Sequence, residues 1–182
     1  LPILTQRQSA LDAKELAEAG FNGEQIFEIL ERVKMESSIY ITVDTLKFLK
    51  KGGRITPAAA ALGTLLRIKP VLQIQGEKLD SFSKVRTMKQ ARTTMLAAAG
   101  KDLKDRFADP EAENTWMLVA HTQNDEMAAE FAKEIEEHYP KAGAVYRAPL
   151  SLSIACHIGP GSLAVAMSKK IDIEAEWKRY GL

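Results

Sequence analysis

The stretch from Val43 to Leu72, VDTLKFLKKGGRITPAAAALGTLLRIKPVL, constrains this chain more than any other. A β-branched run at residues 39–43 leads into it and predicts a buried strand. Residues 44–45 then offer an N-cap oxygen for a short helix, which the glycine pair at 52–53 ends. A strand followed directly by two short helices is therefore expected here.

A second helix is predicted from Ala58 to Leu66, with Thr56 as its N-cap and Pro57 at its first position. It contains alanines, leucines and one glycine, and no charge before Arg67. A helix without a polar face is buried on most sides. It is therefore either a core helix on a sheet or the wall of a narrow apolar tunnel that admits a chain-like ligand. The residues of that wall would be Ala59, Ala60, Leu62, Gly63 and Leu66.

Hydrophobic periodicity predicts the remaining elements. Further helices are expected from Ser9 to Ala19, with Ser9 as a candidate N-cap, and after Asn22, which caps the next helix. Others are expected over 87–107, over 125–138 with a cap supplied by residues 122–124, over 151–156, and at the end of the chain over 171–182. Further strands are expected over 68–75, 79–85, 116–121, 144–147 and 162–168, with a hairpin across Gly76. Pro70 indicates that the strand over 68–75 is an edge strand, or that the proline occupies a non-bonded position in it. Gly100 is expected to bend or break the helix over 87–107. The prediction is an α/β fold with a mixed β-sheet flanked by helices.

Length, charge and cysteine count limit the classes of protein that this chain can belong to. The 182 residues suit one domain, or one domain plus a fragment of another, and 46% apolar content suits a buried core. A formal net charge of +1 gives no support to a nucleic-acid partner or an anionic membrane. The single cysteine, Cys156, allows no internal disulfide, which favours a reducing, cytoplasmic location. No run approaches the roughly 20 apolar residues of a membrane span, so no integral membrane segment is expected.

Histidine spacing gives no metal site. His121, His138 and His157 have neither finger-like spacing nor a cysteine pair nearby, so no metal and no cofactor are expected. His157 precedes the rigid turn formed by Gly159, Pro160 and Gly161. Such a turn can hold a side chain at a pocket mouth and expose backbone N–H groups to an anion, although a structural histidine is the alternative.

A second anion-binding candidate is the Gly53-Arg54 pair. Glycine lets an anion approach the backbone, while the alternative is a helix–helix turn with a solvated arginine. Nucleophilic catalysis has little support, because Cys156 adjoins His157 without an orienting acid and there is no G-x-S-x-G elbow. No catalytic residue is therefore expected. The alternatives to a binding protein are a small acyl hydrolase using Cys156 or a serine, and a structural or oligomer-forming domain.

Three motifs in order resemble the DegV family of bacterial fatty-acid-binding proteins. They are DTLKFLKKGGRI with the alanine-rich helix and IKPVL, then KVRTMKQA from Lys84, then HIGPGSL from His157. The resemblance runs from about Leu11 to Met167. It implies a carboxy-terminal α/β domain over 38–182, preceded by a helical lead-in from the first domain over 1–37. Residues 1–7 do not match the family pattern well, so the resemblance assigns them no role.

The resemblance also implies a function. It suggests a protein, not an enzyme, that holds a long-chain fatty acid in an apolar tunnel and presents the carboxylate to a separate fatty-acid kinase. His157, with Gly159 and Gly161, would hold the carboxylate. Arg86 would contact the ligand or the kinase, where a guanidinium suits a carboxylate or a phosphate. The resemblance further implies that the chain lacks nearly all of the family's amino-terminal domain, which helps to hold the carboxylate.

Overall fold

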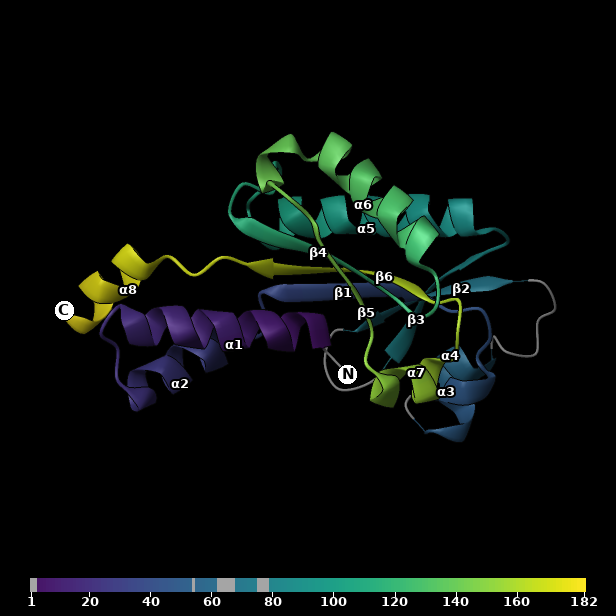
Figure 1. Ribbon diagram of the computed structural model, residues 1–182, viewed down its shortest axis with the longest axis horizontal. Helices are drawn as coiled ribbons and strands as arrows, with labels where there is room; N and C mark the ends of the chain where they lie inside the picture. Colours follow the sequence, from purple (N-terminus) through teal and green to yellow (C-terminus); the bar gives the residue numbers. More distant parts are fainter. Residues whose placement is uncertain (1–2, 54, 62–67, 75–78) are drawn as a thin grey trace.

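One mixed sheet of six strands forms the centre of the molecule (Figure 1). The computed structural model describes residues 3–53, 55–61, 68–74 and 79–182. The strand order is β3-β2-β1-β6-β4-β5, and among the described neighbouring pairs only β4 with β5 is parallel. The strands are β1 (Ser37–Thr42), β2 (Lys69–Ile74), β3 (Leu79–Val85), β4 (Thr115–His121), β5 (Tyr146–Pro149) and β6 (Leu163–Lys169). The predicted α/β fold with a mixed sheet is confirmed.

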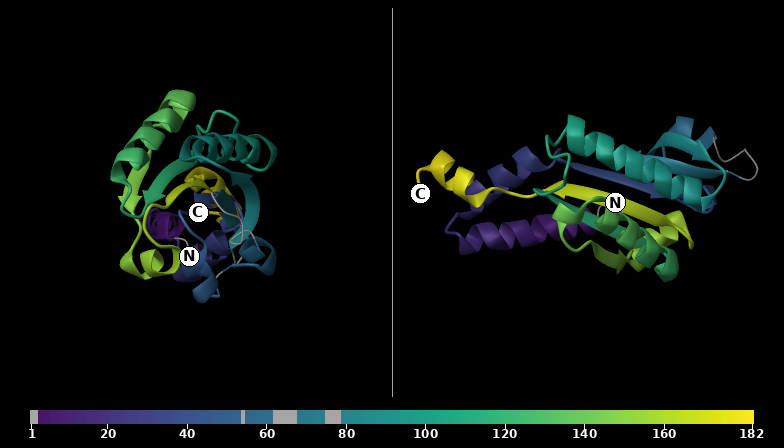
Figure 2. Two further views of the ribbon diagram at one scale, coloured as in Figure 1. Left: turned by 90° about the vertical axis from the view of Figure 1, so that its right-hand side faces the viewer. Right: turned by 90° about the horizontal axis from the view of Figure 1, so that it is seen from above.

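Helices cover both faces of this sheet (Figure 2). One face carries α5 (Met88–Asp105) and α6 (Asp125–His138), the second followed by the 3-10 turn η2 (Pro140–Ala142). The other carries α1 (Ile3–Glu18), α3 (Lys47–Lys51), α4 (Pro57–Ala61) and α7 (Leu152–Ile158). At the end of the sheet away from α7, α2 (Gly23–Val33) and α8 (Ile173–Tyr180) lie beside α1.

Alternation along the central strands divides their side chains between two cores. Tyr40 and Val165 belong to the cluster under α5 and α6, while Ile41 and Ala164 belong to the cluster over α3, α4 and α7. Two core faces explain why β4 and β6 read as nearly continuous apolar runs. A third, small cluster around Leu16 joins α1 and α2 to the α8 segment.

Several helices begin with a side-chain cap, and the caps at Asn22 and Thr56 were predicted. Asn22 forms a full capping box with Gln25, and the Thr87 side chain accepts from the N–H of Gln90. The Thr56 hydroxyl accepts from the N–H of Ala59 at 3.3 Å, as expected for an N-cap before Pro57. These local signals are sufficient because each involves residues within one turn of the chain.

Other predictions are corrected by the structure. Ser9 is no N-cap, because α1 begins at Ile3 and the Ser9 hydroxyl donates to the Thr5 carbonyl inside the helix. Pro70 does not mark an edge strand, since β2 lies between β3 and β1. Its ladder with β1 begins only at Val71, so Pro70 occupies a position that the ladder does not need. Gly100 neither bends nor breaks α5; a Cβ there would lie 2.7 Å from the Tyr139 hydroxyl.

Parts of two predictions lie outside the described residues. The predicted turn across Gly76 is one, although β2 and β3 pair antiparallel as a hairpin requires. The other is the second half of the alanine-rich helix, because α4 is described from Pro57 to Ala61 and residues 62–67 are not.

Candidate functional site

His157 lies in the last turn of α7, and its side chain is half-buried. The helix ends at Gly159, whose N–H donates to the Ala155 carbonyl. Gly159 has φ 79° and ψ 177°, a backbone conformation that is essentially restricted to glycine. Gly161 also has φ 79°. The rigid glycine turn predicted after His157 is therefore present, and it carries the chain from α7 into β6.

One side of this turn is bonded to the end of β4. The Thr122 hydroxyl donates to the Gly159 carbonyl at 2.6 Å and accepts from the Ser162 N–H at 3.0 Å. The Thr122 backbone carbonyl accepts from Gly161 at 2.7 Å, and its N–H donates to Ser162 at 3.1 Å. The Asn124 side chain donates to the Gly161 carbonyl at 3.4 Å. Asn124 is the N-cap residue of α6, yet its side chain makes no capping bond, contrary to the predicted role of residues 122–124.

The other side of the turn packs on α3 and the residues before it. A Cβ built on Gly159 would lie 2.5 Å from Cδ2 of Phe48, so only glycine fits against that ring. A Cβ on Gly161 would lie 3.4 Å from Cβ of Asp44. The Asp44 carboxylate in turn pairs with the ammonium of Lys69 at the start of β2. The His157 turn is thus held between the carboxyl ends of β1 and β4.

His121 ends β4 beside this turn and has a structural role. Its side chain is 5% exposed, and Nδ1 accepts the Asn124 N–H at 3.2 Å. A neutral imidazole therefore carries its proton on Nε2, which lies 3.4 Å from Oδ1 of Asp125. That carboxylate also pairs with Arg147 on β5 at 2.5 Å. These contacts join the start of α6 to β4 and β5.

Only some of the predicted tunnel wall can be located. Ala59 is completely buried in the core cluster over α3, α4 and α7. Ala60 belongs to α4, but its side chain is outside the description. Leu62, Gly63 and Leu66, like Arg54, lie outside the described residues. Ala59 faces the core, but Pro57, Ala58 and Ala61 of the same helix are exposed, so the described part of α4 is not buried on most sides as predicted.

Arg86 lies apart from His157. It directly follows β3 and is exposed, in a hollow of about 640 Å³. The hollow is lined by Lys84, Val85, Arg86, Lys89, Gln90, Thr93 and Thr94. Because β1, β3 and β4 all run the same way, Arg86 and the His157 turn lie at the same end of the sheet. They adjoin helices on opposite faces, α5 and α7, so the structure does not bring them into one pocket.

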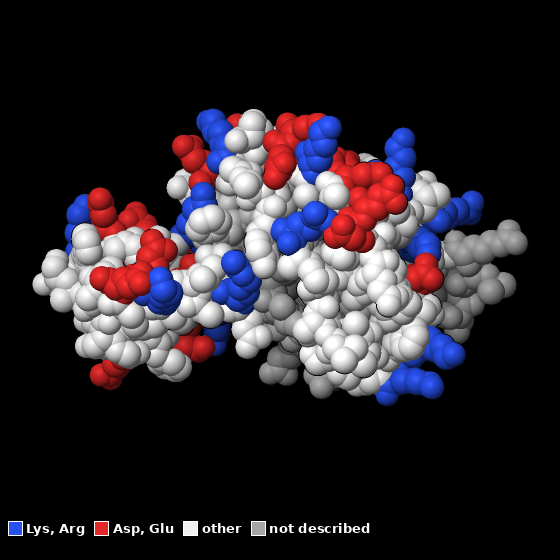
Figure 3. All heavy atoms as spheres, in the orientation of Figure 1, with Lys and Arg blue, Asp and Glu red and all other residues white. Residues whose placement is uncertain are grey.

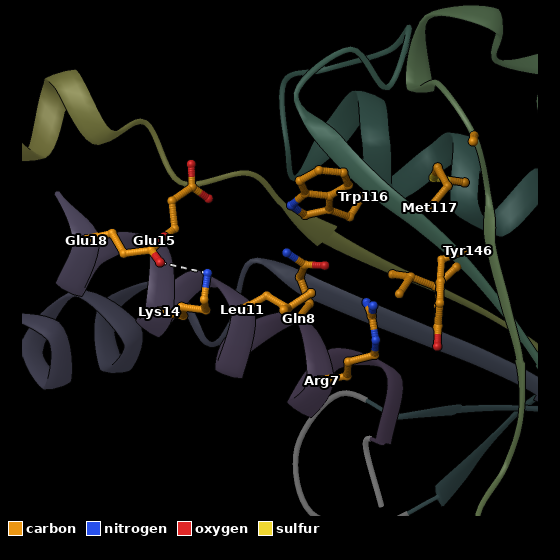
Figure 4. A pocket seen from close by; sticks show the side chains of 11 residues that line it. Arg7, Gln8, Leu11, Lys14, Glu15, Glu18, Trp116, Met117 and Tyr146 are labelled. Carbon is orange, nitrogen blue, oxygen red and sulfur yellow. Dashed lines mark ion pairs between the residues drawn. The ribbon is translucent and has the colours of Figure 1, made fainter.

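A further hollow of about 580 Å³ lies between α1 and strands β4 and β5 (Figure 4). Leu11, Trp116 and Tyr146 form much of its apolar lining, and the Arg7 guanidinium lies 3.9 Å above the centre of the Tyr146 ring. Trp116 and Tyr146 remain 37% and 39% exposed, which is unusual for large aromatic residues. Sequence patterning did not identify this hollow, because it forms between segments far apart in the chain.

The face shown in Figure 3 is neither strongly basic nor strongly acidic. Acidic and basic side chains are interspersed on this face. Uncharged surface covers the area just right of centre in its lower half, around α7, with basic side chains at the right-hand edge. Leu152 at the start of α7 is 79% exposed. Within the described ranges, no group of three acidic, histidine or cysteine side chains is arranged to hold a metal ion. In that same part of the chain, no helix has the length and apolar character needed to cross a bilayer.

The fold is a mixed α/β domain with the glycine turn at one end of its sheet. The N–H groups of Gly159, Gly161 and Ser162 all donate within the protein, so the turn does not expose them to an anion as the sequence suggested. The model of the DegV family matches residues 3–170, and the chain belongs to the DegV family. The DegV domain-containing protein YqaC of Lactococcus lactis is 36% identical over 158 residues, which cover 86% of this chain and 53% of that protein. Protein DegV of Bacillus subtilis is 31% identical over 166 residues, which cover 91% of this chain and 57% of that protein. The chain therefore spans little more than half the length of these relatives.

Solved structures give the same fold. DegV of Bacillus subtilis, described as a fatty acid binding protein, superposes with a TM-score of 0.77 at 30% identity, covering 92% of this chain and 57% of that one. A DegV family protein from Thermus thermophilus, described by its fatty acid binding, gives 0.79 at 30% identity, covering 89% and 56%. A stearic acid-binding protein from Eubacterium ventriosum gives 0.80 at 24% identity, covering 94% and 57%, and supports the fold alone.

Proposed function

We propose that this chain is part of a fatty-acid-binding protein that holds a long-chain fatty acid non-covalently and carries out no chemistry on it. The observation that carries the proposal is the similarity, at 30% identity, to two solved DegV proteins described as binding fatty acids. The position of His157 supports it, because its half-buried imidazole lies in the last turn of α7, before a glycine turn that Thr122 holds on one side and Phe48 on the other.

His157 is the proposed carboxylate ligand, with Gly159 and Gly161 shaping the turn beside it. An imidazole N–H can donate to a carboxylate, and a hydrogen bond to a charged group contributes roughly 1.5–3 kcal/mol. The half-buried position of the side chain suits this role, because it limits screening by water while leaving access to a ligand.

The acyl chain would supply most of the affinity. Each buried methylene contributes about 0.8 kcal/mol, so a long chain binds tightly without specific polar contacts. We keep Ala59, Ala60, Leu62, Gly63 and Leu66 as the proposed wall, and Gly63→Leu tests it. A wall residue predicts a shorter accepted acyl chain, whereas a core residue predicts lost stability with unchanged chain-length preference.

We further infer that the binding unit includes a region equivalent to the rest of the full-length relatives, of which this chain spans 53–57%. The uncharged surface over α7, with Leu152 79% exposed, suits coverage by such a region. Arg54 and Arg86 remain proposed contacts for the ligand or for a fatty-acid kinase that receives the carboxylate. The lone cysteine supports a cytoplasmic location.

The test is His157→Ala, made in the gene product with any residues encoded upstream of Leu1. Palmitate binding measured by calorimetry should weaken about 10- to 150-fold, with little change in melting temperature. Unchanged affinity would remove His157 from the site. Covalent labelling of Cys156 or a serine by an acyl-directed probe would instead support the hydrolase alternative.

A further inference from the structure

Thr122 uses every polar group it has on the turn that follows His157. Its hydroxyl donates to the Gly159 carbonyl and accepts from the Ser162 N–H, and its backbone exchanges bonds with Gly161 and Ser162. Thr122 is 4% exposed and Ser162 is fully buried, so water does not readily replace these bonds. Among the described residues, Asn124 and Ser162 each make one side-chain hydrogen bond to this turn, whereas the Thr122 hydroxyl makes two.

These bonds determine where α7 ends. The Gly159 carbonyl, which accepts the Thr122 hydroxyl, belongs to the residue that terminates the helix two positions after His157. The turn has Phe48 packed against its opposite side, so it is held from two directions. Releasing one side would let the last helical turn, and the imidazole that it carries, move away from their present direction.

We propose that Thr122 is a positioning residue that aims the His157 imidazole at the ligand carboxylate. This inference rests on the fatty-acid-binding function proposed above. The role needs a hydroxyl, because a hydroxyl can donate to one partner and accept from another at the same atom. Serine should therefore replace Thr122 well, and valine should not.

Thr42 provides a matched control. It lies at the same end of the sheet, because Thr42 and His121, the residue before Thr122, both pair with Leu163. It is also completely buried, but its hydroxyl oxygen makes no hydrogen bond to the described residues. Thr42→Val and Thr122→Val thus remove the same group from similar surroundings, and only the second removes bonds to the turn.

The experiment compares palmitate with 1-hexadecanol, which has the same chain length but no carboxylate. Thr122→Val, Thr122→Ser and Thr42→Val are made in the gene product, with any residues encoded upstream of Leu1 included. Thr122→Val should weaken palmitate binding roughly tenfold or more and leave hexadecanol binding within about threefold. Thr122→Ser and Thr42→Val should bind both ligands within about threefold of the original protein. In a His157→Ala background, Thr122→Val should have no further effect on palmitate.

The proposal would be overturned if Thr122→Val weakened the binding of palmitate and of 1-hexadecanol equally, because a general loss of structure affects both ligands alike. Additive effects of Thr122→Val and His157→Ala would also overturn it. Should Thr122→Val not fold, a tenfold loss of palmitate binding in Thr122→Ser would contradict the role of the hydroxyl. If the unaltered protein binds no palmitate, the proposed function itself fails and this inference falls with it. If it binds palmitate but Thr122→Val shows no selectivity, only the positioning role fails.

Discussion

Gly159 lies so close to the ring of Phe48 that a Cβ on the glycine would come within 2.5 Å of Cδ2. Its φ of 79° and ψ of 177° are also essentially closed to other residues. Gly159→Ala should therefore destabilise the domain by about 2–4 kcal/mol, combining backbone strain with overpacking. Urea unfolding of the 182-residue chain measures this.

Gly161→Ala is the matched control for that substitution. Gly161 shares the φ of 79°, but a Cβ there meets Asp44 at an acceptable 3.4 Å. It should cost only the backbone term, about 1–2 kcal/mol. Removing the ring with Phe48→Ala should recover part of the loss in Gly159→Ala and none in Gly161→Ala. Equal losses in the two alanine variants would show that the contact with Phe48 has no energetic consequence.

A buried carboxylate joins α5 to β1. Asp102 accepts hydrogen bonds from the hydroxyls of Ser38 at 2.5 Å and Tyr40 at 2.7 Å, and it pairs with Arg106 at 3.1 Å. Asp102→Ala leaves two buried hydroxyls and a guanidinium without this partner, so it should lower the free energy of unfolding by about 3–5 kcal/mol. Tyr40→Phe removes one bond and should cost about 1.5–3 kcal/mol. A smaller loss in Asp102→Ala than in Tyr40→Phe would contradict this account of the network.

The sequence predicted elements whose signals are local, and missed contacts between distant segments. Asn22 and Thr56 were recognisable as caps because their partners lie three residues away. The glycine turn after His157 was also visible, because its composition alone restricts the backbone. The contact of Thr122 with this turn could not be predicted, because Thr122 lies 37 residues before Gly159 and nothing in the sequence around it indicates that contact. Ser9 was wrongly taken as a cap because its hydroxyl can bond equally to a helix interior.

Asp12 on α1 gives a prediction that depends on pH. Burial raises the pKa of this carboxyl above its ordinary value of 3.8, while a hydrogen bond from the Gln8 amide at 2.8 Å opposes the shift and Glu15 adds to it. The folded state then binds the proton more tightly than the unfolded state, so this group's contribution to stability is greatest below pH 3.8 and declines as pH rises through the folded pKa.

Asp12→Asn removes that decline and can keep the bond from Gln8. The free energy of unfolding of Asp12→Asn, minus that of the original chain, should therefore be larger at pH 7 than at pH 4. Urea unfolding at the two pH values measures the difference, and a carboxyl NMR titration measures the pKa directly. A titration midpoint at or below 3.8, or a relative stability that does not change with pH, would contradict the prediction.

The most direct test of the fatty-acid-binding function is native mass spectrometry of the purified gene product, followed by organic extraction. The product should include any residues encoded upstream of Leu1, since this chain spans little more than half the length of its relatives. The account predicts a protein species heavier by one fatty acid, and a long-chain fatty acid in the extract. A protein that carries no lipid, and that takes up none when palmitate is added, would contradict it.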